Sequence, residues 1–143
     1  MTLTQKHYGN ANDDYVNFTD DSIGLTTRWD QRGRRRAAGP VPTAVVGAAA
    51  GTGATLTSIT GSDESGTLTI NGGTAPAAGV LATVTFSGAY SVAPYVTVFP
   101  KTAAAAPLQL YASATTTALV ISCAVAPAAS ASIVLDYQAI GGA

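Results

Sequence analysis

Nine consecutive residues, Arg28 to Arg36 ("RWDQRGRRR"), gather the most chemically distinctive side chains of this sequence. They hold five of the seven basic residues and the single tryptophan of a 143-residue chain. Arginine clusters neutralise phosphate charge, which is typical of nucleic-acid binding. Arginine and tryptophan are also enriched at the buried centres of protein interfaces, where the planar guanidinium pairs with carboxylates through two hydrogen bonds. A basic processing site and a solvated linker are two further interpretations.

The charges around this segment favour a protein interface. Residues 1–36 hold six basic and five acidic residues, so their net charge is only +1. No aromatic ladder, zinc-ligand spacing or recognition-helix pattern accompanies the arginines. A processing site is disfavoured because the start of the sequence lacks the basic and then apolar pattern of a secretory signal. We therefore predict contact with another protein, and no binding of nucleic acid, through a set of nine residues: Tyr15, Phe18, Ile23, Arg28, Trp29, Arg32, Arg34, Arg35 and Arg36.

The other reactive side chains do not form a catalytic pattern. His7 is the only histidine and lies in a polar stretch, which is typical of a solvated residue. Cys123 ends an apolar segment, so we expect a buried structural thiol. Asp63 and Glu64 are adjacent in "GSDESG", which is typical of a turn, and Asp136 stands alone. The glycine-rich segments match no phosphate-binding loop. We predict no enzymatic activity and no catalytic, cofactor or metal site.

The distribution of charge divides the chain. Charged residues make up 10% of the sequence, against about 25% in ordinary soluble domains, and eleven of the fifteen lie in residues 1–36. Those residues show no sustained helical or strand period, so we expect an extended N-terminal docking arm. Residues 37–53 are rich in Pro, Gly and Ala and predict a linker that contains a short extended apolar piece. Residues 54–143 then form one domain.

Seven short segments in this domain alternate in polarity or have strand-forming compositions. Their even spacing predicts an antiparallel β-sandwich or Greek-key barrel of about seven strands. We expect Leu68 and Ile70 on one face of the second strand, and Val80, Ala82 and Val84 with Phe86 on one face of the third. A fragment that begins near Gly51 is expected to fold alone. The predicted strands are 55–60, 66–71, 80–86, 95–100, 108–113, 118–123 and 132–140.

Residues 51–141 also show an ordered set of short motifs. They open with "GTGAT", place a Ser/Asp-rich turn before "GTLTI", continue through "PAAGVLATVTF" and a proline before the next strand, and close with "DYQAIG". This set resembles a β-domain found in virion structural proteins of tailed bacteriophages, at the ends of head or tail fibres and in small surface proteins. The resemblance implies a non-enzymatic, trimeric β-sandwich. It identifies no receptor-binding residue in this sequence, and it does not extend to the first 36 residues.

Together, the arm and the resemblance favour a capsid decoration or minor capsid protein, docked by its arm on other virion proteins such as the major capsid protein. A tail-tip or tail-fibre receptor-binding protein is the alternative, with a host-surface glycan as a further partner. A carbohydrate-binding or hydrolytic module is a third hypothesis, but the sequence lacks the aromatic platform and the separated carboxylates that would support it. We expect location on the virion surface after assembly in the host cytoplasm. The longest stretch of low polarity, 44–50, is far below the roughly 20 residues that span a bilayer, so no membrane insertion is expected.

Overall fold

The computed structural model describes the backbone of residues 3–8, 15–20, 25–30, 35–36 and 39–141, and the side chains within 39–141. The chain divides into two compact units, Met1–Pro40 and Val41–Ala143. Each unit is described by itself below. All the long elements of the described residues are strands, which confirms the predicted all-β class.

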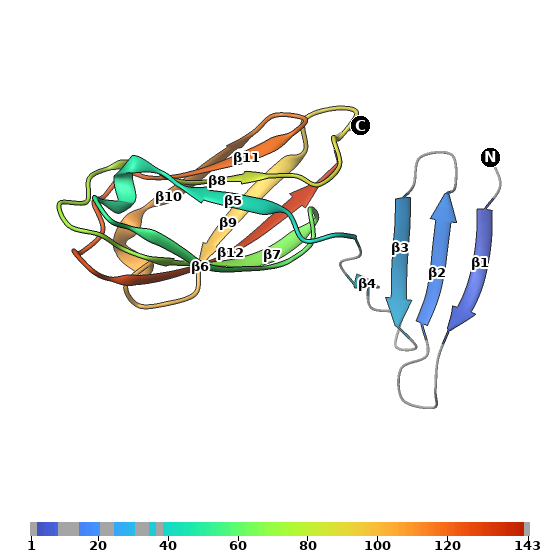
Figure 1. The fold of residues 1–143 in the computed structure, drawn as a ribbon. Coiled ribbons are helices and arrows are strands. Elements are labelled where there is room, and N and C mark those ends of the chain that lie inside the picture. The colour runs from blue at the N-terminus through green and yellow to red at the C-terminus, as the bar shows by residue number, and fades with distance from the viewer. Residues whose placement is uncertain (1–2, 9–14, 21–24, 31–34, 37–38, 142–143) are drawn as a thin grey trace. The chain divides into compact units, whose positions relative to one another are not determined.

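The second unit is a sandwich of two four-stranded antiparallel sheets (Figure 1). One sheet has the order β10-β11-β8-β5 and the other β6-β7-β12-β9. All seven predicted strands are present, and β5 is an eighth. The strands are β5 (Thr43–Val46), β6 (Thr55–Gly61), β7 (Ser65–Asn71), β8 (Gly79–Thr85), β9 (Tyr95–Pro100), β10 (Leu110–Ala114), β11 (Ala118–Cys123) and β12 (Ser132–Ile140); two 3-10 turns are η1 (Ala48–Ala50) and η2 (Ala106–Leu108).

The hydrophobic core lies between the two sheets. Alternate residues of each strand point inward, because successive side chains of a strand project from opposite faces. Leu68 and Ile70 on β7 are fully buried, as predicted from their alternation with threonines. The same inward rows include Ile133, Leu135 and Tyr137 on β12, and Leu119 and Ile121 on β11.

A β-bulge corrects one of the predicted faces. Ile121 of β11 pairs with Ala82 of β8, but the next residue, Ser122, pairs with Val80, so Leu81 is an extra residue in β8. The extra residue reverses the alternation on its N-terminal side. Leu81 is therefore fully buried, and Val80, predicted to face the core, is exposed. Ala82, Val84 and Phe86 keep the predicted inward face.

The linker predicted over 37–53 is wrong for most of its length. β5 pairs with β8 through Thr43↔Thr85 to Val46↔Ala82, and Ala49 and Ala50 of η1 belong to the buried core. Gly47 makes this possible, because a Cβ there would overlap the backbone carbonyl of Val80. The small residues of this segment therefore allow it to pack closely against β8.

The first unit also differs from the extended arm predicted for 1–36. Its described residues form an antiparallel sheet of order β1-β2-β3-β4. The sequence between these strands is rich in Gly, Asn and Asp, which favour hairpin connections, and the segments around Tyr15 and Trp29 contain strand-forming residues. The bounds are β1 (Leu3–Tyr8), β2 (Tyr15–Asp20), β3 (Leu25–Asp30) and β4 (Arg35–Arg36).

Candidate functional site

Backbone pairing in the first unit brings together much of the predicted interface. Tyr15 and Phe18 lie on β2, Arg28 and Trp29 on β3, and Arg35 and Arg36 on β4. Ile23, Arg32 and Arg34 lie outside the described residues. The register places Arg36 opposite Arg28 and Arg35 opposite Trp29, while Val16 lies opposite Trp29 on the other side.

This register has an electrostatic consequence. Like charges at directly opposed positions destabilise an antiparallel pair. The register places two arginines, Arg28 and Arg36, at such opposed positions, and a third, Arg35, is next to Arg36 on β4. A partner that supplies carboxylates would relieve this repulsion and pair with the planar guanidinium groups.

The remaining reactive groups are dispersed. His7, the only histidine of the sequence, lies on β1 opposite Val16. Cys123 is buried, with its Sγ 3.8 Å from the carbonyl oxygen of Ala77, which agrees with the predicted structural thiol. Within the described residues, no three His, Cys, Asp or Glu side chains are grouped so that they could hold a metal ion. None of the helical turns described has the length and apolar character needed to span a bilayer.

Asp63 connects two loops at one end of the sandwich. It lies between β6 and β7, as its predicted turn chemistry required. Its Oδ1 accepts a 2.8 Å hydrogen bond from the Ser87 amide, and its Oδ2 accepts bonds of 2.6 Å from the Ser87 hydroxyl and 3.0 Å from the Gly88 amide. Both carboxylate oxygens are thus engaged in holding the segment after β8, which is a structural use of the group.

Tyr137 lies beside this connection and remains neutral. Its hydroxyl donates a 2.7 Å hydrogen bond to the carbonyl of the buried Ser62. Burial raises the pKa of Tyr137 well above its usual range, and the negative charge of Asp63 raises it further. A phenol held neutral and bonded to a backbone carbonyl cannot serve as a base, and its hydrogen bond joins β12 to the turn between β6 and β7.

Asp136, the middle residue of β12, forms a small polar cluster on the outer face of its sheet. Its Oδ1 accepts a 2.5 Å hydrogen bond from the Thr67 hydroxyl, and the Lys101 Nζ lies 3.2 Å from the same oxygen. The hydrogen bond from Thr67 lowers the pKa of Asp136, burial opposes this effect, and Lys101 lowers the pKa further. The carboxylate is therefore held ionised at neutral pH, and no histidine or second carboxylate joins this cluster in the described contacts.

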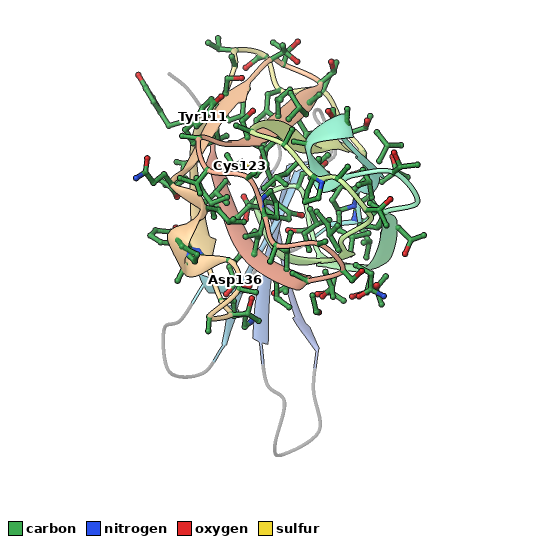
Figure 2. All side chains as sticks on the ribbon, turned by 90° about the vertical axis from the view of Figure 1, so that its left-hand side faces the viewer. Tyr111, Cys123 and Asp136 are labelled. Atoms are coloured by element: carbon green, nitrogen blue, oxygen red, sulfur yellow. The ribbon has the colours of Figure 1, made fainter. Side chains whose placement is uncertain are left out.

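Three large aromatic side chains on the β-domain are exposed, and the sequence analysis did not select them. Tyr95 and Phe99 lie on β9, and Tyr111 lies on β10 of the opposite sheet. Figure 2 shows Tyr111 projecting away from the sandwich, whereas Cys123 lies within it and Asp136 marks β12. A signal was present in "YVTVFP", since its alternation puts Tyr95 and Phe99 on the same face.

Comparisons with models of protein families, with curated proteins and with solved structures found no match for this chain. The resemblance of residues 51–141 to bacteriophage β-domains therefore stays a prediction. Function has to be argued from the residues themselves. They offer two candidates for contact: the arginine-rich sequence of β3 and β4, and the exposed aromatic side chains of the β-domain.

Proposed function

We propose that this chain is a non-enzymatic structural protein of a bacteriophage virion surface, a capsid decoration or minor capsid protein. In this proposal the first unit docks on the particle and the β-domain is exposed. The observation that carries it is the division of the chain at Pro40. The unit before that residue holds most of the charge and the paired arginines, and the unit after it is a charge-poor sandwich.

The chemistry of the two units supports this assignment. Polar side chains in the β-domain are used for internal fastening, as with Asp63 and Tyr137, rather than gathered around a reactive centre. Threonines alternate with fully buried residues on β7, where Thr67 and Thr69 are half-buried on the outer face. The virion context rests on the motifs of residues 51–141, which resemble the β-domains of phage fibres and small surface proteins.

The expected partner of the first unit is another virion protein, the major capsid protein or a tail-tip protein, with an acidic docking surface. The register puts Arg28 and Arg36 on one face of this sheet and Trp29 and Arg35 on the other, so one face supplies two charges and the other a charge with an apolar residue for such a contact. Truncating a buried tryptophan or a paired arginine at the centre of an interface costs about 2–4 kcal/mol of binding free energy. A homotrimer, as the resemblance implies, is part of the proposal.

A second candidate function is receptor binding at a tail tip or tail fibre. The exposed Tyr95 and Phe99 on β9 favour it, because surface aromatic groups of this kind are common in recognition sites. The two candidates differ in where the protein lies on the particle. Labelled electron microscopy of purified particles distinguishes capsid from tail location.

Incorporation into particles tests the docking role. Residues 41–143 alone, and the variant with Trp29→Ala, Arg34→Ala and Arg35→Ala, are compared with the full chain in cells that supply the remaining virion proteins. Both are expected to be soluble and to lose at least tenfold in occupancy, because about 1.4 kcal/mol corresponds to a factor of ten. Lys6→Ala is the matched control, a basic residue of the same unit outside the arginine segment.

Two outcomes contradict the proposal. Normal occupancy of residues 41–143 would show that the first unit is dispensable for docking. Full incorporation of the triple variant, together with loss of salt-sensitive DNA binding by the free protein, would assign the arginines to nucleic acid instead.

A further inference from the structure

Two neighbouring strands of the β-domain present a row of exposed side chains on the outer face of the sheet β6-β7-β12-β9. Tyr95 is 75% exposed and Phe99 53% exposed. On the adjacent strand, Ile140 pairs with Tyr95, Gln138 with Thr97, and Asp136 with Phe99. We call these six residues the β9/β12 strip: Tyr95, Thr97, Phe99, Asp136, Gln138 and Ile140.

The fold fixes the outward direction of this strip. The intervening residues of β9, Val96 and Val98, pack against the core, and so do Tyr137 and Ala139 of β12. Their neighbours must therefore face solvent. Tyr95 and Phe99 are four residues apart, which separates them by about 13 Å along the strand. The strip is thus an outward-facing surface with an aromatic ring near each end of β9.

Polar groups lie between and beside the two rings. Thr97 and the exposed Gln138 form the cross-strand pair between the aromatic positions and offer a hydroxyl and an amide. The carboxylate of Asp136 lies opposite Phe99. Among the described residues, its hydrogen bonds from Thr67 and Lys101 both reach Oδ1, so Oδ2 is available as an acceptor.

We propose that the β9/β12 strip binds a neutral oligosaccharide. The C–H faces of pyranose rings are apolar and stack on aromatic side chains, while their hydroxyls need donors and acceptors at the same level. The strip offers both in alternation. The centre of a protein–protein interface is instead a continuous apolar patch with few charges, whereas here an amide and a hydroxyl separate the rings.

The charges of the strip decide the class of sugar. Asp136 is the only carboxylate among the six residues, none of which is basic, and Lys101 forms an ion pair with it at 3.2 Å. This pair has no net charge, so the strip has no net charge with which to attract a strongly anionic polysaccharide. This inference goes beyond virion docking and does not rest on it, because the binding can be measured on the free protein.

A panel of soluble neutral oligosaccharides, built from hexoses, N-acetylhexosamines and deoxyhexoses, tests the proposal with the full chain. At least one member is expected to bind saturably in titration calorimetry. Tyr95→Ala and Phe99→Ala should each weaken that binding at least tenfold, and Gln138→Leu should weaken it as well. Tyr111→Ala is the matched control, because Tyr111 is 56% exposed on the opposite sheet. It should leave affinity unchanged.

Three outcomes overturn the proposal. Absence of binding across the whole panel excludes a neutral sugar. Binding that Tyr95→Ala and Phe99→Ala leave intact places the sugar elsewhere. If those two variants instead turn a self-associating chain into a monomer in sedimentation, without any sugar binding by the parent, the strip is covered by a second copy of the chain. Circular dichroism of each variant establishes that it is folded before binding is measured.

Discussion

The phenolic hydroxyl of Tyr137 donates a hydrogen bond of 2.7 Å to the backbone carbonyl of Ser62, although 75 positions separate the two residues in sequence. Both residues are buried. The bond joins β12, the last strand, to the turn between β6 and β7. In the same turn, the carboxylate of Asp63 holds the segment that follows β8. One short turn therefore connects a strand of its own sheet to a loop from the other sheet.

Removing this hydroxyl should destabilise the β-domain. Tyr137→Phe is expected to lower the free energy of unfolding by about 1–3 kcal/mol, because the buried carbonyl of Ser62 loses its donor. Tyr95→Phe is the control, since its side chain is exposed. Chemical denaturation followed by circular dichroism measures both variants. Equal stability of the two would mean that water replaces the lost donor at no cost.

Gly66 should not tolerate a side chain. It is the register partner of Tyr137, and a Cβ at this position would overlap the carbonyl oxygen of Thr60 and lie 2.5 Å from the Tyr137 hydroxyl. Gly66→Ala is therefore expected to cost at least about 1–3 kcal/mol of stability. Gly88→Ala is the matched control, because its Cβ would meet nothing nearer than the Asp63 carboxylate at 4.0 Å. A thermal melt should separate the two clearly.

Asp63→Ala should release the loop that follows β8. The amides of Ser87 and Gly88 lose their acceptors, so their hydrogen exchange should accelerate, and global stability should fall by about 1–2 kcal/mol. The amide of Lys101, which donates to the Val134 carbonyl at 2.9 Å, is the internal reference. Unchanged protection at Ser87 and Gly88 would show that backbone packing alone holds the loop.

Asp136 should make stability fall in acid. Its folded pKa lies below the ordinary value of 3.8, so its contribution is present above pH 3.8 and is lost as the pH falls through the lower folded pKa. The effect should stay below about 1 kcal/mol, because the carboxylate is partly exposed and screened by solvent. Asp136→Asn should flatten this part of the Tm-against-pH curve. Thr67→Val should flatten it more than Lys101→Ala, since the Thr67 hydroxyl is the leading cause. The reverse order would make the ion pair dominant.

Strand periodicity predicted most of the β-domain because residues such as Leu68 and Ile70 alternate with threonines along a regular strand. This reasoning failed at the β-bulge of β8 and in the segment of small residues before β6. The bulge at Leu81 reverses the faces of β8, and nothing in the sequence of β8 marks the extra residue. The small residues of 43–50 resemble a linker in composition, although Ala49 and Ala50 are buried. Whether alanine and glycine form a linker or a close contact depends on what packs against them.

The contact surfaces were harder to predict. The arginine–tryptophan segment was selected for its composition, but the Arg28↔Arg36 pairing depends on a register that the sequence alone does not show. In "YVTVFP" both faces of the strand are apolar, so the alternation could not decide whether the valines or the aromatic residues face solvent. The neighbouring β12 decides it, because Tyr137 and Ala139 direct Val96 and Val98 inward.

The boundary between the two units gives the sharpest test of this fold. Residues 41–143 should fold alone with a β-type circular dichroism spectrum and a cooperative melt. Residues 51–143, the fragment that composition favoured, lack β5 and η1. They lose the buried Ala49 and Ala50 and the contacts of Val46, and β8, still paired with β11, loses its partner on the other side and becomes an edge strand. The shorter fragment should therefore be less stable by at least about 3 kcal/mol, and its open edge should promote aggregation. Equal melting temperatures for the two fragments would mean that residues 41–50 lie on the domain without holding it together.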